Sequence, residues 1–229
     1  MLVKRRFLSA VVAVGLGLAV AACGARTGYA DVADIPESLG TDRTSIVVGD
    51  PAADTTVRLY EDPRCPACKE FETKGAGPEL HRMTMKGTVQ VHYTFASFLD
   101  GKLGGNGSKK AVNALRAALE EGKFVEYHQV LYTHQPEETV DGFTDALLLQ
   151  MASQVEGLRG ERFDTAVRTM KYQVFVDASE KVFQHSTAVG TPAMEVNDVP
   201  LPEHQDGMIL FDKGYFTRYI GEVVASQPS

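Results

Sequence analysis

The chain is poor in cysteine: it has three among 229 residues, at Cys23, Cys65 and Cys68. A domain whose core is held together by disulfides carries more cysteines, at wider spacing. A bridge between Cys65 and Cys68 would close a very small loop, which removes little entropy from the unfolded chain. A role as a structural disulfide is therefore a poor explanation of this pair, and we expect the two cysteines to take part in a chemical reaction.

An excess of positive charge is also absent. The net charge is −7, and it becomes −10 when the three cations Lys4, Arg5 and Arg6 near the start are removed. An acidic protein gains no electrostatic attraction to nucleic acid and is repelled by anionic lipid headgroups. We therefore expect no nucleic-acid partner, and any attachment to a membrane must have a source other than charge.

The apolar run near the N-terminus is too short for a stable spanning helix. It extends from Phe7 to Ala22 behind the three cations, as in a targeting segment. It ends in the letters VAAC, which resemble the lipobox of bacterial lipoproteins and close at Cys23. We predict a lipoprotein signal peptide over 1–22 and lipidation of Cys23. The alternative is an ordinary signal peptide with a chance cysteine.

The segment that follows Cys23 has no periodicity and is rich in Gly, Ala, Thr and Asp. We expect residues 23–44 to form a flexible tether between the lipid and the folded domain. Because several acyl chains hold a protein to a bilayer stably, the predicted location is the outer side of a bacterial cell membrane.

The motif CPAC at residues 65–68 stands between two different patterns. A strand pattern covers 55–60, and a helical pattern begins at Lys69 and is expected to kink near Gly75 and Pro78. A cysteine at a helix N-terminus faces unpaired N–H groups and the positive end of the helix dipole, which stabilise its thiolate. Because the thiolate is the form that attacks disulfides, this layout indicates a redox-active dithiol.

The rest of the chain divides into strand-like ends and a helical middle. Strands are predicted over 45–48, at a sheet edge, and over 89–95. From 107 to 186 apolar residues recur at intervals of three, four and seven, which predicts a series of amphipathic helices. A hairpin over 193–201, turning at Asn197-Asp198, and a closing helix over 216–224 complete the pattern.

Two motifs together resemble those of a known family. CPACKEFE follows a strand, and Gly190-Thr191-Pro192 precedes the returning strand. The pair resembles the DsbA-like thiol:disulfide oxidoreductases, and more narrowly their extracytoplasmic lipoprotein members in Gram-positive bacteria. The resemblance implies an α/β fold: a thioredoxin fold with an inserted α-helical subdomain. The implied boundaries are 45–100 and 187–229 for the thioredoxin-fold domain and 101–186 for the insertion.

The resemblance also implies the roles of four residues. In that family the proline that matches Pro192 is cis and lies across from the CxxC motif, and the backbone of the residue before it, here Thr191, pairs with an extended substrate. Cys65 is implied to be the exposed sulfur that attacks or is attacked, and Cys68 the more buried resolving partner. No cofactor is implied beyond the redox-active disulfide between Cys65 and Cys68.

The motif departs from the family at its centre. Pro66 supplies no N–H and stiffens the loop, but Ala67 stands where many members carry His or another polar residue. We therefore expect a Cys65 thiolate that is less stabilised than in the most oxidising members. Its pKa is still expected below the roughly 8.5 of free cysteine.

A second departure concerns a buried acid. Members of the family often carry Glu six residues before the first cysteine, where it can transfer protons, and Leu59 occupies that position here. Glu61 or Asp62 is a candidate replacement. The alternative is that both are solvated loop carboxylates without a role.

The six histidines are scattered, with no pair at i, i+4, and no second local ligand pair accompanies the CxxC motif, so no metal site is predicted. The predicted enzyme is a dithiol oxidase that acts on cysteine-containing secreted or cell-envelope proteins and is reoxidised by an integral membrane partner linked to quinone. Two alternatives stay open: an extracytoplasmic reductase, for example in cytochrome maturation, and a non-catalytic thioredoxin-fold lipoprotein. The absence of a heptad repeat favours a monomer.

Overall fold

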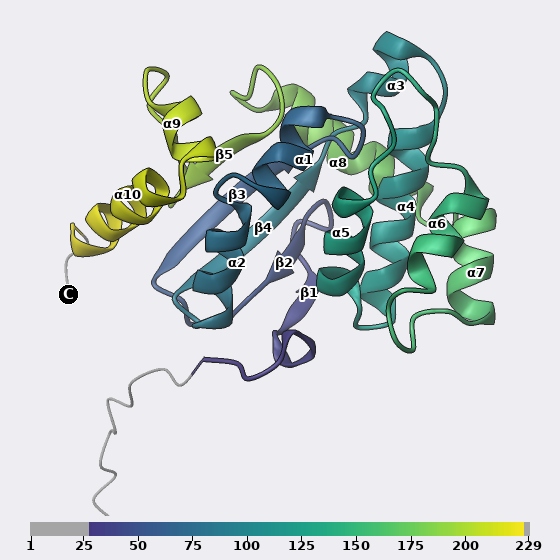
Figure 1. Ribbon diagram of the computed structural model, residues 1–229, viewed down its shortest axis with the longest axis horizontal. Coiled ribbons are helices and arrows are strands. Elements are labelled where there is room, and N and C mark those ends of the chain that lie inside the picture. Colours follow the sequence, from purple (N-terminus) through teal and green to yellow (C-terminus); the bar gives the residue numbers. More distant parts are fainter. Residues whose placement is uncertain (1–27, 227–229) are drawn as a thin grey trace, which may run out of the picture.

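The computed structural model describes residues 28–226, and these residues are built around a sheet of six strands in the order β1-β2-β4-β3-β5-β6 (Figure 1). The strands are β1 (Glu37–Leu39), β2 (Ile46–Val48), β3 (Thr55–Glu61), β4 (Val89–Phe95), β5 (Ala193–Val196) and β6 (Val199–Pro200). The helices are the 3-10 helix η1 (Val32–Asp34), α1 (Pro66–Thr73), α2 (Gly77–Met85), α3 (Phe98–Leu103), α4 (Gly107–Glu120), α5 (Phe124–Thr133), α6 (Asp145–Ala152), α7 (Glu161–Arg168), α8 (Gln173–His185), α9 (Asp206–Phe211) and α10 (Lys213–Ala225).

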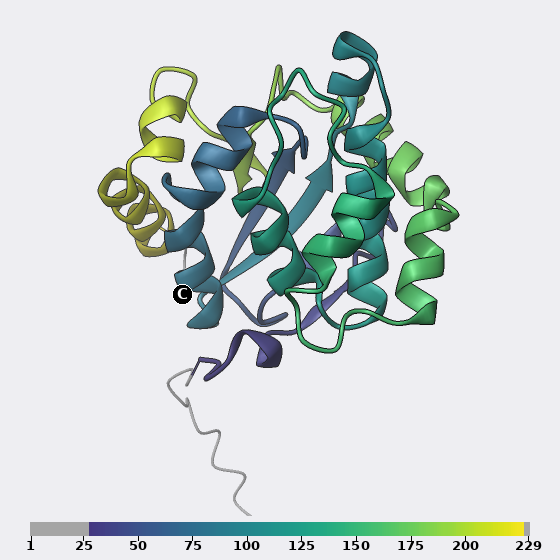
Figure 2. The same cartoon turned by 45° about the vertical axis from the view of Figure 1, so that its right-hand side comes forward.

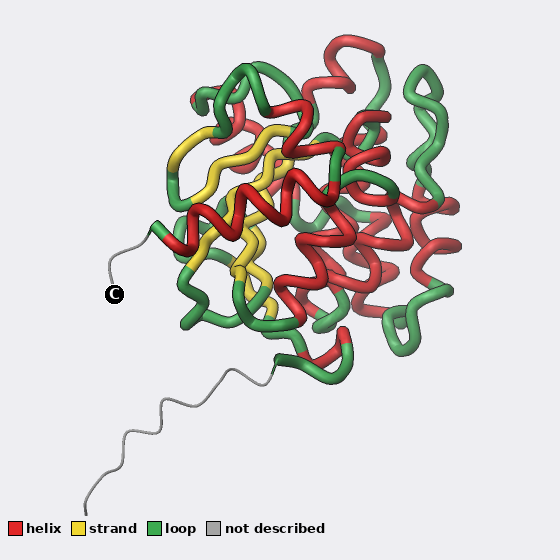
Figure 3. Tube along the Cα trace, turned by 60° about the vertical axis from the view of Figure 1, so that its left-hand side comes forward, coloured by secondary structure: helices red, strands yellow, loops and turns green. Residues whose placement is uncertain are grey.

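Strand β3 lies inside the sheet and leads to the CPAC motif. It pairs with β4 in parallel and with β5 antiparallel, so that Val57 lies opposite both Val91 and Val196. Successive side chains of a strand point to opposite faces. Leu59 accordingly packs in the cluster that contains Phe71 of α1, whereas Tyr60 packs with Phe183 of α8 on the other face. Helices therefore cover both faces of β3. Figure 3 shows helices, in red, packed against the strands, in yellow.

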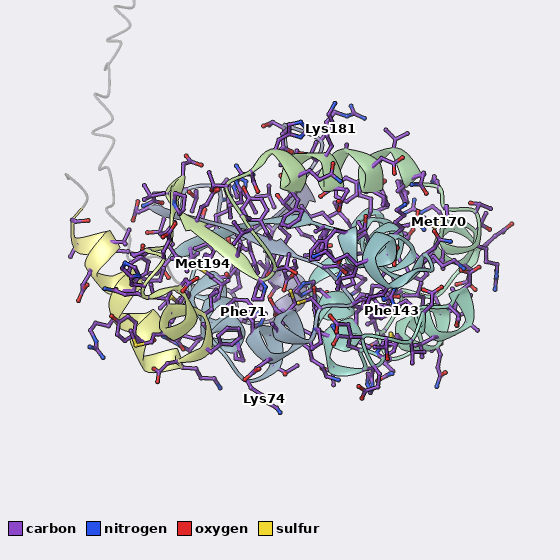
Figure 4. All side chains as sticks on the ribbon, turned by 90° about the horizontal axis from the view of Figure 1, so that it is seen from above. Phe71, Lys74, Phe143, Met170, Lys181 and Met194 are labelled. Carbon is purple, nitrogen blue, oxygen red and sulfur yellow. The ribbon has the colours of Figure 1, made fainter. Side chains whose placement is uncertain are left out.

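Helices α3 to α8 all lie between β4 and β5 in the chain, and they gather at one side of the sheet (Figure 2). The apolar intervals predicted these helices, and α4 to α8 confirm them. Seen from above in Figure 4, Phe71 and Met194 lie on the side of α9 and α10, whereas Phe143 and Met170 lie within this helical block. The CPAC motif, at the start of α1, is thereby placed where the two parts meet.

Three local expectations are wrong. The predicted tether reaches too far, because Glu37–Leu39 form a strand that pairs with Ile46–Val48, and β2 is consequently interior rather than at the edge. The helix after CPAC does not kink but ends at Thr73 and restarts as α2 at Gly77. Position 75 between them has room only for glycine, because a side chain there would meet the Leu210 carbonyl oxygen at 2.7 Å. Short strands such as β1 carry too little periodicity to be recognised in the sequence.

The predicted hairpin is confirmed. Asn197 and Asp198 have φ of 52° and 62°, the left-handed conformation that tight two-residue turns between antiparallel strands require. Pro200 lies in β6, at the edge of the sheet, where its missing N–H leaves no ladder bond unmade. The predicted signal segment 1–22 and Cys23 lie outside the described residues. Among residues 28–226, none of the helices has both the length and the apolar character needed to cross a bilayer.

Candidate active site

The CPAC motif occupies the junction of β3 and α1, as predicted. Strand β3 ends at Glu61, the Cys65 N–H donates to the Asp62 carbonyl at 2.9 Å, and Cys65 is the N-cap residue of α1. Pro66 stands in the first turn, where a missing N–H costs no helical hydrogen bond. Both cysteines are free thiols in this structure. The local sequence therefore places Cys65 at the N-terminus of α1, the positive end of the helix dipole.

The Thr191–Pro192 peptide bond is cis, and it lies beside the motif. The Cys65 thiol donates to the Thr191 carbonyl oxygen at 3.2 Å across 126 residues of chain. Against expectation Cys65 is 8% exposed rather than open to solvent, because this backbone closes over it. Cys68 is fully buried, as predicted for a resolving cysteine.

The two thiols are perturbed in opposite directions. The pKa of Cys65 is lowered to about 6, first by the thiol of Cys68, then by the Thr191 side chain and by the backbone N–H groups of Cys68 and Ala67. Burial raises the pKa of Cys68 well above its ordinary value, and its nearness to Cys65 and Glu61 raises it further. The missing polar group at position 67 is thus offset chiefly by the Cys68 thiol, and the backbone donors at the start of α1 add to this effect.

Glu61 occupies the place of a buried acid beneath the motif. It follows Leu59 by two residues and so points to the same face of β3, toward α1. It is 0% exposed, and burial raises its pKa well above the usual value, helped by the Cys65 charge. Burial therefore favours the protonated form of Glu61, and in its charged form Glu61 lies near enough to Cys68 to raise the pKa of that thiol. The interpretation of Glu61 as a solvated loop carboxylate is wrong.

Asp62 is equally buried but serves the fold. It accepts hydrogen bonds from the Ser108 hydroxyl at 2.6 Å and from the backbone N–H groups of Arg64 and Leu99 at 3.0 and 3.1 Å. Arg64 in turn pairs with Asp100 at 3.0 Å, both side chains being 2% exposed. We call Asp62, Arg64, Asp100 and Ser108 the anchor network, because it fixes the loop before CPAC to the helical block.

Sequence reasoning missed two residues of the site, His128 and Glu72. His128 on α5 approaches Glu61 with 2.9 Å between Nε2 and Oε2, and its Nδ1 lies 4.0 Å from Oε2 of Glu72 on α1. We call Glu61, His128 and Glu72 the histidine bridge. The sequence held one signal for it: His128 lies on the apolar face of its predicted helix beside Phe124 and Leu131, where a solvated imidazole does not belong.

Two cavities lie near the motif, on different sides. One, of about 330 Å³, lies between α1, α2 and α5 and is lined by Glu72, His81 and His128 among others. The second, of about 430 Å³, is lined by Thr191, Pro192 and neighbouring residues of β5, β6 and α9. The predicted substrate residues thus border a cavity that is separate from the one at the histidine bridge.

The histidine bridge is also a group whose ligand atoms lie within 4.8 Å of one another, a spacing at which a metal ion could fit. Its closest donor and acceptor are already joined by a hydrogen bond, and burial raises the pKa of both carboxyl groups. A protonated carboxyl is a poor metal ligand, so the geometry is better explained by shared protons. Among residues 28–226, neither cysteine belongs to such a group of three.

Comparisons with known proteins agree with this geometry. The chain is 25% identical over 163 residues to disulfide bond formation protein D of Bacillus subtilis, covering 70% of the chain and 71% of that protein. The oxidised crystal structure of BdbD from Bacillus subtilis superposes with a TM-score of 0.68 at 21% identity, covering 84% of this chain and 100% of that one. Reduced DsbA from Mycobacterium tuberculosis gives 0.63 at 23%, covering 85% and 94%.

These likenesses confirm the predicted α/β thioredoxin fold with inserted helices. The model of the thioredoxin family described as "Thioredoxin" matches residues 41–208, which include both cysteines, the helical block and Pro192. Because this match spans most of the chain, the chain belongs to the thioredoxin family.

Proposed function

We propose that this protein is a thiol-disulfide oxidoreductase that introduces disulfides into secreted or cell-envelope proteins through Cys65 and Cys68. The observation that supports it most is the placement of Cys65 at the N-cap of α1, with its sulfur 3.2 Å from the Thr191 carbonyl beside the cis Pro192. A sulfur at the start of a helix, next to backbone that can pair with an extended chain, is arranged to meet a cysteine in a peptide.

The exchange follows from the two thiols. A substrate thiolate attacks Sγ of Cys65 in the oxidised protein, the Cys65–Cys68 bond breaks, and Cys68 leaves as a thiolate. Glu61 gives its proton to this buried thiolate. A second substrate thiolate then attacks the substrate sulfur of the mixed disulfide, and Cys65 leaves as a thiolate. Two electrons pass from the two substrate thiols to the cysteine pair.

The direction of this exchange is supported by the Cys65 thiolate. Its pKa of about 6 makes the reduced protein carry a stabilised thiolate at neutral pH, which favours the reduced pair and makes the disulfide an oxidant. Thr191 and Pro192 are proposed to hold the substrate, with Pro66 and Ala67 shaping the loop. Cysteine-containing client proteins and an integral membrane reoxidant linked to quinone complete the proposed cycle.

Placement outside the cytoplasm suits this chemistry, because disulfides persist in oxidising compartments. Lipidation of Cys23 after removal of 1–22 is proposed to hold the protein on the cell membrane, with a tether shortened by the ordered strand β1. The proposed division into 45–100 with 187–229, and 101–186, follows the position of the helical block in the chain. Membrane fractionation of Cys23→Ser tests the anchor: the variant should leave the membrane fraction.

The decisive experiment combines turnover and potential. Purified protein is mixed with a reduced substrate protein in a glutathione buffer, and disulfide formation is followed for the wild type, Cys65→Ser and the matched control Cys23→Ser. Activity should vanish in Cys65→Ser alone. Equal behaviour of the wild type and Cys65→Ser would support the alternative of a non-catalytic binding protein.

The equilibrium potential against glutathione then separates the two directions of electron flow. A value near roughly −120 to −180 mV supports the oxidase, and one near roughly −270 mV supports the reductase.

A further inference from the structure

The histidine bridge contains buried polar atoms that no fixed partner satisfies. Oε1 of Glu61, Oε1 of Glu72 and the hydroxyl of Tyr132 have no well-formed hydrogen bond within residues 28–226. Glu72 and Tyr132 nevertheless lie close enough to Glu61 to lower its pKa, against the effect of burial. An unpartnered buried oxygen costs about 1–3 kcal/mol, so several together in a core call for an explanation. Groups that gain and lose protons during a reaction cycle provide one, because a fixed donor or acceptor suits only one of their protonation states.

On the substrate side, Cys68 itself has no exposed surface. Cys68 is fully buried, Cys65 is 8% exposed, and the Thr191 backbone closes over Cys65. In the mixed disulfide a substrate chain would cover this side further. Yet Cys68 must take up a proton when it leaves and give one up when the disulfide is remade. These protons need a path that does not pass the substrate.

The other side has such a path. Glu72 and His128 line the cavity of about 330 Å³ between α1, α2 and α5, and the Glu72 side chain is 11% exposed. Figure 1 shows α1 between α2 and α5, in front of the sheet, and Figure 2 shows the same helices from another side. His128 joins this cavity to Glu61, because Nε2 contacts the buried carboxyl and Nδ1 faces Glu72.

We propose that His128 and Glu72 form a proton path that connects Glu61, and through it Cys68, to water in the cavity between α1, α2 and α5. The inference rests on the proposed function, since it specifies how the proton of that exchange reaches solvent. His128 and Glu72 are positioning and proton-transfer residues here, and they do not touch the substrate.

The proton balance closes in each half of the cycle. When Cys68 leaves as a thiolate, it takes the proton of Glu61, and the Glu61 carboxylate takes the proton from Nε2 of His128. Nδ1 of His128 takes the proton of Glu72 once the two side chains close the 4.0 Å between Nδ1 and Oε2. A water in the cavity replaces the proton on Glu72. One proton has moved from water to Cys68, and the imidazole has changed its tautomer. When the disulfide is remade, Cys68 loses its proton along the same path, and the imidazole returns to its first tautomer.

The protonation states support this direction of transfer. Burial raises the pKa of Glu72 to about 8, with the Glu61 charge adding to it, and burial lowers the pKa of His128. A neutral imidazole between two protonated carboxyls can accept at one nitrogen while it donates at the other. The titratable groups that surround the path on the neighbouring elements are Cys65 and Cys68 of α1, Asp62 after β3, His81 of α2, Tyr93 of β4 and Tyr132 of α5.

The test is a single-turnover reaction of the oxidised protein with a fluorescent dithiol peptide, measured from pH 5.5 to 8.5. Glu72→Gln and His128→Gln keep size and hydrogen bonding but cannot pass a proton, so both should slow the reaction about 10-fold or more at pH 7 and alter its pH profile. Glu72→Asp should retain part of the rate. In His128→Ala, added imidazole should restore the rate by entering the cavity.

A matched control and a second reaction separate proton transfer from damage to the fold. His134→Gln alters an exposed histidine just after α5, which bonds Gln154, and should react like the wild type. Alkylation of reduced Cys65 by iodoacetamide needs the Cys65 thiolate but no proton for Cys68. Its rate should stay within about 2-fold of wild type in Glu72→Gln and His128→Gln.

Three outcomes would overturn the path. Unchanged rates and pH profiles in Glu72→Gln and His128→Gln would do so, and so would an equal slowing of alkylation. A rate that depends on added Zn²⁺ through Glu72 and His128 would reassign the cluster to a metal. Failure of the proposed function is distinct, because the wild type itself would then fail to oxidise the peptide.

Discussion

Two clusters of buried polar residues begin at adjacent residues, Asp62 and Glu61, and their carboxyl groups differ in how many hydrogen bonds they accept. The anchor network starts at Asp62, and its carboxylates accept hydrogen bonds from the Ser108 hydroxyl, from the Arg64 guanidinium and from several backbone N–H groups. The histidine bridge starts one residue earlier, at Glu61, and leaves carboxyl oxygens of both Glu61 and Glu72 without partners. Outside the carboxyl groups, Nε of Arg64 in the anchor network also lacks a partner within the described residues. Neighbouring acids in one chain thus have different surroundings.

This difference indicates that Asp62 stabilises the fold and that Glu61 takes part in proton transfer. Burial raises the pKa of Asp62 to about 7, and the hydrogen bonds that it accepts lower the pKa against that effect and hold the side chain in one place. A carboxyl next to an imidazole and a cavity can change its state at little cost to the fold. The anchor network is therefore expected to control stability, and the histidine bridge to control proton movement. Four predictions test this division.

The largest effect is expected from the buried ion pair of the anchor network. Replacing Arg64 by Met leaves Asp100 buried and charged without its partner, which should lower the free energy of unfolding by about 3–5 kcal/mol. Urea unfolding of the reduced protein measures it. Asp141→Asn is the control, because this carboxylate lies 3.9 Å from Arg64 but is 48% exposed, and it should cost less than about 1 kcal/mol. Equal losses would contradict the importance of burial.

The two adjacent acids provide the next comparison. Asp62→Asn turns an amide N–H₂ toward groups that already donate, so it should cost about 1–3 kcal/mol. Glu61→Gln resembles the protonated carboxyl that is already present and should cost less than about 1 kcal/mol, while it slows disulfide exchange. Both are measured by urea unfolding at pH 7 and by single-turnover oxidation. A larger loss of stability in Glu61→Gln than in Asp62→Asn would reverse the division.

The dependence of stability on pH sharpens the comparison. Glu72 has a pKa of about 8 in the folded protein and an ordinary value when unfolded, so above the ordinary value the unfolded chain releases a proton that the folded one keeps. Its stabilisation is present at low pH and is lost as the pH rises toward 8. Glu72→Gln should therefore remove about 2 kcal/mol of the decline between pH 6 and 7.5. Parallel curves for the two proteins, from urea unfolding at each pH, would contradict it.

The sequence predicted the parts of this site that are local and missed those that are not. CPAC between a strand and a helix, and Thr-Pro before a returning strand, were enough to predict the fold and to select the residues that we propose to face substrate. Side-chain alternation also allowed Glu61 to replace the acid missing at Leu59. His128 and Glu72 meet only because α5 packs on α1, a contact that no local pattern encodes. Asp62 could not be separated from Glu61, since its partners lie in distant segments.

The smallest effect is expected from two buried hydroxyl groups. One belongs to the anchor network, and the other lies beside the histidine bridge. Ser108 donates to Asp62 at 2.6 Å and is fully buried, so Ser108→Ala should cost about 1 kcal/mol. The buried Tyr132 hydroxyl beside the histidine bridge has no partner, and Tyr132→Phe should leave stability unchanged or raise it slightly. Because Tyr132 is not part of the proton path, exchange rates should also stay near wild type. Urea unfolding and single-turnover oxidation measure both effects. If Tyr132→Phe lowers the free energy of unfolding more than Ser108→Ala does, the Tyr132 hydroxyl has a hydrogen-bond partner in solution. The unpartnered oxygens of the histidine bridge would then no longer support the proton path.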